Sequence, residues 1–114
     1  MLTRFTPARL PGLRLWLDAS TGLFSDDGVT IAAADALVYR WNDRSGNGSN
    51  ALQTTEALRP QLKVGVFGGR PVLRFDGTAD HMLATIATLT QPFTAFVVAN
   101  IAASAATSRT PLGF

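Results

Sequence analysis

The sequence predicts an all-β protein that folds as an antiparallel β-sandwich. Two strand-like pieces, one ending at Trp41 and one at Phe75, each carry an aromatic residue and are each followed by an Asp and glycines that reverse the chain. Hydrophobic residues make up 46% and charged residues 16% of the chain, a composition that favours folding over disorder. The length of 114 residues predicts one domain, with residues 1–12 as an extended arm and residues 13–114 as part of the sandwich.

The charge and the cysteine content exclude several classes of function. The net charge is only +2 and the ten basic residues are dispersed, so the sequence carries no electrostatic footprint of a nucleic-acid-binding protein. Without cysteine, the chain has neither a disulfide framework nor a thiolate metal site. The N-terminus lacks the apolar core of a signal peptide, and no apolar run is long enough to span a bilayer.

The first half of the chain contains two predicted strands. Residues 13–18 alternate, with Leu13, Leu15 and Leu17 on one face, and predict a strand with one buried face. Residues 19–28 predict a loop. Residues 29–36 favour a short strand or an irregular segment, with a helical turn as the alternative. Residues 37–41 predict a strand with Leu37, Tyr39 and Trp41 on one face, and residues 43–50 predict a turn region.

The second half predicts a hairpin and a long apolar strand. Residues 51–63 are expected to form a polar connection. Residues 64–67 and 72–75 flank Gly68-Gly69-Arg70, which is a hairpin signal. Residues 81–84 predict a short strand. Residues 93–101 are apolar on both faces, which predicts a central strand packed on two sides.

Two turns carry a resemblance to a known family. The runs Trp41-Asn42-Asp43-Arg44-Ser45-Gly46-Asn47-Gly48 and Leu73-Arg74-Phe75-Asp76-Gly77-Thr78-Ala79-Asp80 resemble turns of the concanavalin A-like lectin/glucanase superfamily, in particular its laminin-G-like jelly-roll modules. Residues 13–19, the pair Arg59-Pro60 and residues 92–98 match further family pieces in the same order. The resemblance implies a concanavalin A-like, jelly-roll β-sandwich of which this chain is the N-terminal half.

The resemblance also implies a function. Such modules occur in phage particle proteins and in bacterial surface proteins, and we expect a non-catalytic structural or attachment component of a virion, such as a tail, fibre or capsid-decorating protein. A chain without signal peptide or disulfides fits assembly in the host cytoplasm. We expect an oligomer that contacts other virion subunits, a chain that completes the sandwich, or host-surface glycans. The alternative is an extracellular carbohydrate-binding lectin domain of a secreted bacterial protein.

The turn after Trp41 has two interpretations. Asp43, Asn47 and the glycines Gly46 and Gly48 favour a structural turn, in which Trp41 anchors the core and Asp and Asn bond their own backbone. Alternating oxygen side chains followed by glycine are also how a calcium loop begins. The bidentate Glu that an EF-hand needs at its twelfth position is Thr54 here, so we expect no cofactor, with calcium as the minority alternative.

The turn after Phe75 is the candidate binding rim. Asp76, Asp80 and His81 are the candidates for contacting a sugar, while capping of the turn around Gly77 is the plainer interpretation of the two carboxylates. The family usually has an aromatic residue where this chain has His81, so the match is weaker there.

Catalysis is not expected. Glycoside hydrolysis needs two carboxylates across a cleft, and the hydrolases of this superfamily carry a Glu-x-Asp-x-x-Glu strand, whereas Glu56 is the single Glu of this chain. No nucleophile elbow, zinc-protease motif or phosphate loop occurs. Trp16 and Tyr39 are candidates for stacking on sugar rings, although their positions beside strand alternation favour core packing.

Overall fold

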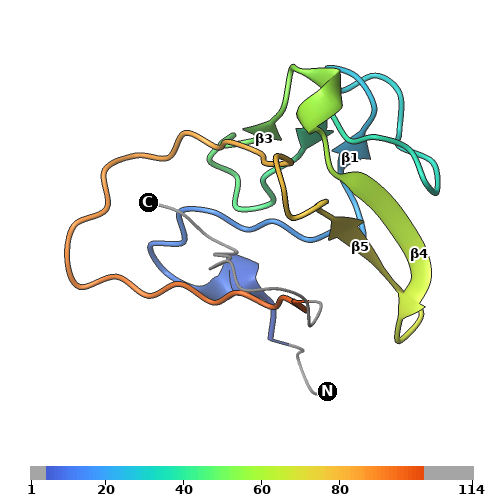
Figure 1. Ribbon diagram of the computed structural model, residues 1–114. Coiled ribbons are helices and arrows are strands. Elements are labelled where there is room, and N and C mark those ends of the chain that lie inside the picture. Colours follow the sequence, from blue (N-terminus) through green and yellow to red (C-terminus); the bar gives the residue numbers. More distant parts are fainter. Residues whose placement is uncertain (1–4, 102–114) are drawn as a thin grey trace.

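A computed structural model describes residues 5–101 and shows two small antiparallel sheets (Figure 1). The first sheet has the order β1-β2-β3, formed by Leu23–Phe24, Arg40–Trp41 and Ala51–Leu52. The second is a hairpin of β4, Gln61–Phe67, and β5, Arg70–Arg74. Two 3-10 turns, η1 at Pro7–Arg9 and η2 at Glu56–Leu58, are the helical elements of the described residues. The all-β, antiparallel prediction is therefore confirmed at this coarse level.

The three-stranded sheet is short but is extended by isolated bridges. Trp41 of β2 pairs with Leu23 of β1 on one side and with Ala51 of β3 on the other. Phe24 also bridges Ile31, and Leu52 bridges Leu83. The bridge at Leu83 brings the predicted short strand 81–84 to the edge of this sheet.

The hairpin is the most regular element. Lys63 pairs with Val72, and after an irregularity in register Phe67 pairs with Arg70. Gly68 and Gly69 form a two-residue turn with φ of 56° and 75°, the left-handed conformation that a type I′ turn requires and that glycine adopts without strain. The predicted hairpin is confirmed, and β4 begins three residues earlier than the sequence predicted.

The core lies between the two sheets. Leu23, Ala32, Val38 and Leu62 form one buried cluster, and Trp41 packs against it while remaining partly exposed. Pro60 is fully buried. Among the described residues, no helix is long and apolar enough to cross a membrane.

Several strand predictions were wrong in the first half of the chain. Residues 13–18 form no strand, because their polar contacts are made with the 43–50 turn and not with a neighbouring strand. Residues 19–28, predicted as loop, contain β1, and the predicted connection 51–63 contains β3 and η2. Of the predicted strand 37–41, only Arg40–Trp41 forms β2. Val38 is buried, whereas Leu37, predicted on the same face as Trp41, is exposed.

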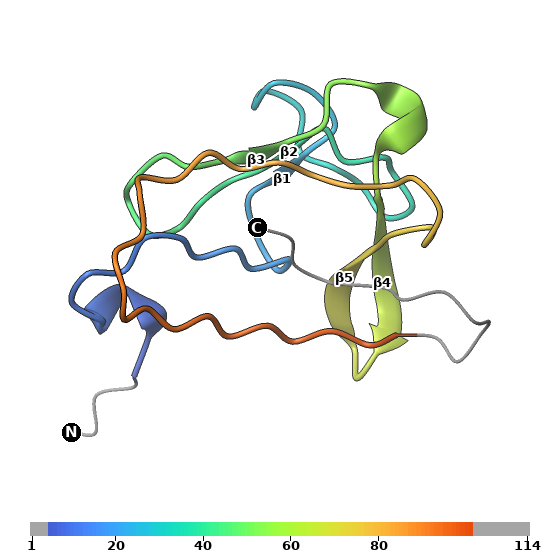
Figure 2. The same cartoon turned by 60° about the vertical axis from the view of Figure 1, so that its left-hand side comes forward.

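The long strand predicted at residues 93–101 is also absent from the described structure. Every residue of this segment is exposed, and it runs along the side of the molecule opposite the three-stranded sheet, as the orange-red ribbon shows in both views (Figures 1 and 2). A strand needs a hydrogen-bonding neighbour, and β1 to β5 all pair elsewhere. Residues 1–4 of the predicted arm and residues 102–114 of the predicted sandwich lie outside the described residues.

Candidate functional site

The carboxylate of Asp43 organises the first turn. Its Oδ1 accepts hydrogen bonds from the backbone N–H groups of Trp16 and Ser45, at 2.9 and 2.8 Å. Its Oδ2 accepts from the Ser45 hydroxyl at 2.7 Å and from the Ser49 N–H at 3.1 Å. Four donors therefore converge on one side chain, and one of them comes from a segment 27 residues earlier.

Asn47 ties the same turn to the same segment. Its Nδ2 donates to the carbonyl oxygens of Leu13 and Arg14, at 2.9 and 3.1 Å, and lies 2.9 Å from the Ser45 hydroxyl. Gly46 and Gly48 on either side have φ of 92° and 71°. Glycine is favoured at both positions because other residues are strained there.

Arg44 completes this attachment. Its guanidinium lies 4.1 Å from the centre of the Trp16 ring and forms an ion pair with Asp18 at 2.8 Å. Its backbone N–H donates to the Trp16 carbonyl at 2.7 Å. We call residues 43–47 together with residues 13–18 the clasp, because the turn holds the earlier segment through both side chains and backbone.

Two carboxyl groups of the clasp, those of Asp43 and Asp18, have lowered pKa values. Burial raises the pKa of Asp43, but the hydrogen bonds from Ser45, Trp16 and Ser49 outweigh it, and the net pKa lies below the ordinary value of 3.8. Hydrogen bonds from the Ser20 hydroxyl and N–H, together with the charge of Arg44, lower the pKa of Asp18. Both groups are thus held as carboxylates at neutral pH.

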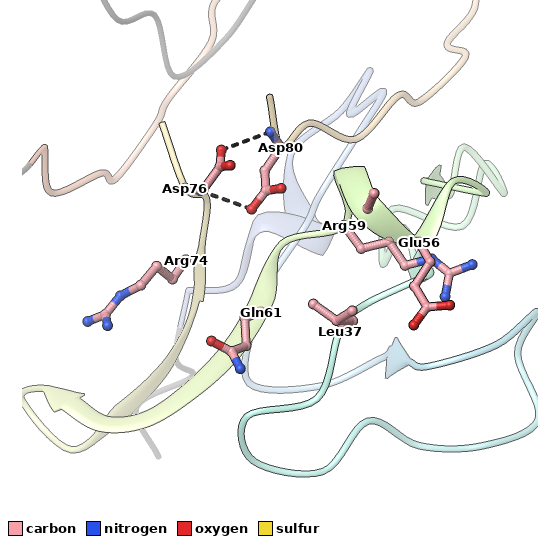
Figure 3. A pocket seen from close by; sticks show the side chains of 8 residues that line it. Leu37, Glu56, Arg59, Gln61, Arg74, Asp76 and Asp80 are labelled. Carbon is pink, nitrogen blue, oxygen red and sulfur yellow. Dashed lines mark hydrogen bonds between the residues drawn. The ribbon is translucent and has the colours of Figure 1, made fainter. Parts of the chain in front are cut away.

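The second turn is capped by a reciprocal pair of aspartates. Asp76 Oδ1 accepts from the N–H groups of Thr78, Ala79 and Asp80, at 2.8 to 3.0 Å. In return, the Asp76 N–H donates to Asp80 Oδ2 at 2.9 Å, and Figure 3 shows the two residues facing each other. Gly77 between them has φ of 75°, and Phe75 before them is exposed.

The structure brings together two of the three candidate rim residues. Asp76 and Asp80 line an open cavity of about 310 Å³ with other polar side chains, namely Glu56, Arg59, Gln61 and Arg74 (Figure 3). His81 is exposed and does not line this cavity; its Nδ1 lies 2.9 Å from the Ala79 carbonyl oxygen. The positions of Arg59, Gln61 and Arg74 around this cavity are not predictable from sequence, because the sequence does not show which strands lie next to each other.

Trp16 and Tyr39, the candidates for stacking on sugar rings, each have an arginine side chain over the ring. Arg44 covers one face of Trp16, and the guanidinium of Arg59 lies 4.9 Å from the centre of the Tyr39 ring. Arg59 is itself fixed by hydrogen bonds to the carbonyl oxygens of Gln53 and Thr54. These contacts are cation–π interactions within the fold.

A larger and more apolar cavity of about 490 Å³ lies beside the core. It is lined by residues of three parts of the chain, namely Ala19–Phe24, Ile31 with Ala32, and Leu62, Val64 and Pro71 of the hairpin, together with Asn42. It opens to solvent and is not an internal void.

The described residues contain no group of three or more His, Asp or Glu side chains arranged to hold a metal ion. Comparisons with family models, with curated proteins and with solved structures find no match.

Proposed function

We propose that this chain is a non-catalytic structural or attachment component of a phage particle, built on a laminin-G-like jelly-roll module of the concanavalin A-like superfamily. In this role it contacts neighbouring subunits, or a chain that completes its sandwich, within a virion assembled in the host cytoplasm. The resemblance of its two turns to that family motivates the assignment. The contact role is supported by the surface of the molecule.

One observation carries the proposal of a subunit contact. Every residue of the segment 93–101 is exposed, although most of them are apolar. Phe96 and Val98 of this segment are 89% and 93% exposed. Exposed apolar surface on this scale favours burial against another protein.

The two turns support a non-catalytic role. The carboxylate of Asp43 accepts N–H and O–H donors from its own loop and the N–H of Trp16, and that of Asp76 accepts N–H donors from its own loop, which is the chemistry of a structural cap. Asp43 has its pKa lowered by these bonds, whereas a general acid at neutral pH needs a raised pKa.

Light scattering of the purified chain over a range of concentrations tests the contact. We expect a mass above that of the monomer, and we expect Val98→Ser to lower it. Val29→Ser is the matched control, because Val29 is 86% exposed on a different loop and should leave the mass unchanged. A monomer at all concentrations, or equal effects of the two substitutions, would contradict self-association through this segment.

The cavity beside Asp80 favours a second candidate, a carbohydrate-binding module of a secreted protein. Its carboxylate, amide and guanidinium groups are the kinds that hydrogen-bond sugar hydroxyls. Screening against immobilised glycans, with and without calcium, tests this function. Arg74→Ala should abolish binding, whereas Arg70→Ala on the same strand, outside the cavity, should not.

A further inference from the structure

The side-chain amide of Asn47 combines a structural role with chemical lability. Its Nδ2 makes all three of its contacts to the clasp, to Leu13 O, Arg14 O and Ser45 Oγ. The next residue is Gly48, and no atom lies within 4 Å of the position where a Cβ would stand on it. Both residues are exposed.

An Asn followed by Gly can cyclise without any enzyme. The Gly48 peptide nitrogen attacks Cγ of Asn47, the new C–N bond forms, and the Cγ–Nδ2 bond breaks. The leaving Nδ2 takes up the proton that the peptide nitrogen loses and departs as ammonia. Water then opens the succinimide at either carbonyl and gives aspartate or isoaspartate. Glycine offers the least hindrance to this attack because it has no Cβ, and asparagine is among the thermolabile residues.

We propose that Asn47 is a site of spontaneous deamidation that is coupled to the clasp: the closed clasp slows the reaction, and the completed reaction opens the clasp irreversibly. The coupling follows from the identity of the leaving group. The atom that departs as ammonia is the atom that holds the carbonyl oxygens of Leu13 and Arg14, so the reaction proceeds only with loss of those bonds.

The product cannot restore the attachment. A carboxylate at position 47 is an acceptor only, and it would face two carbonyl oxygens that are also acceptors. Isoaspartate also adds a methylene to the backbone, which displaces the N–H of Ser49 from Asp43 Oδ2. Of its contacts to the turn, segment 13–18 then keeps those to Asp43, Arg44 and Ser45.

Peptide mapping by mass spectrometry tests the proposal on the full chain, incubated folded in mildly alkaline buffer. Asn42, Asn50 and Asn100 are internal references, because they are followed by Asp43, Ala51 and Ile101 instead of glycine. We expect Asn47 to convert at least about tenfold faster than these three, and Gly48→Ala to slow its conversion by a similar factor. Equal conversion of all four asparagines would overturn the site.

Two further measurements test the coupling. Arg44→Ala removes the cation–π and ion-pair contacts of the clasp and should accelerate conversion of Asn47 several-fold, with unchanged hydrogen exchange at the Val38 N–H as evidence of an intact core. In the converted fraction, the Trp16 N–H should exchange faster than in the unconverted protein, since its bond to Asp43 loses support. If Arg44→Ala leaves the conversion rate of Asn47 unchanged, or if the Trp16 N–H stays fully protected from exchange after conversion, the proposed coupling is contradicted. Neither result bears on the proposed function.

Discussion

At the scale of single residues, Trp41 combines core packing with a buried polar atom. It pairs with β1 and β3 and packs against the buried cluster. Its indole Nε1 is buried and has no hydrogen-bond partner among the described residues. An unpaired buried donor costs free energy, so this residue combines favourable packing with an unfavourable polar atom.

Two substitutions separate these contributions. We expect Trp41→Ala to lower the free energy of unfolding by about 3 kcal/mol, through lost packing and the cavity it leaves. Trp41→Phe keeps much of the packing and deletes the unpaired donor, so its cost should stay below about 1 kcal/mol. Urea denaturation measures both; a cost below about 1 kcal/mol for the alanine variant would show that Trp41 is not a core residue.

The lowered pKa values of Asp43 and Asp18 predict a pH dependence of stability. Each group binds its proton more readily in the unfolded chain, so stability is complete above the unfolded pKa and is lost as the pH falls through the folded pKa. The free energy of unfolding should therefore stay level from neutral pH to about pH 5 and decline below about pH 4. Ser45→Ala removes one donor to Asp43 and should make the decline shallower; an identical pH profile would contradict this origin.

At the scale of elements, the hairpin, whose two strands are adjacent in the chain, is predictable from sequence, whereas elements whose partners lie far along the chain are not. The hairpin was predictable because its two glycines and its flanking apolar residues lie within one short stretch. Segment 13–18 forms no strand although its residues alternate, because its partners are a carboxylate and an amide 27 to 34 residues later. Strands of two residues, such as β1 and β3, are too short to produce a periodic pattern.

In the candidate site, too, contacts within one turn were predictable from sequence and contacts between distant segments were not. Capping of each turn by its own aspartate was predictable from sequence, since Asp hydrogen-bonds backbone N–H groups a few residues ahead. The contribution of Arg59 and Arg74 to the cavity beside Asp80 depended on the pairing of β4 with β5. No periodicity in the chain encodes that arrangement.

The hairpin turn offers a test at this scale. Gly68→Ala places a Cβ at φ of 56° in open space, so its whole cost is backbone strain, about 1 kcal/mol. Gly68→Asn should cost less, because Asn followed by Gly is the preferred type I′ pair. Thermal unfolding of both variants measures the difference, and equal melting temperatures would argue against a type I′ turn.

At the scale of the whole molecule, the balance of core and surface predicts a marginal monomer. The buried hydrophobic residues of the described chain are few, namely Leu23, Ala32, Val38, Ala51 and Leu62. Burial of the core must offset the conformational entropy that the chain loses on folding, so a small core leaves only a small free energy of unfolding. Burial of the segment 93–101 and of the apolar cavity by a partner would add what the monomer lacks.

The proposed association predicts that stability depends on protein concentration. A chain stabilised by association unfolds at a higher temperature when it is more concentrated, because the partner binds only the folded form. We expect the melting temperature to rise by several degrees over a hundredfold increase in concentration, and the rise to be smaller for Val98→Ser than for Val29→Ser. A melting temperature independent of concentration would indicate that the folded monomer is self-sufficient.

The guanidinium above Trp16 has a spectroscopic consequence. The chain has two tryptophans, so Trp41→Phe leaves Trp16 as its single indole fluorophore. Arg44 lies 4.1 Å from the centre of that ring, and the emission of Trp16 therefore depends on whether this cation stays in place. The intensity and wavelength of that emission would report, in real time and without a label, when segment 13–18 leaves the turn that holds it.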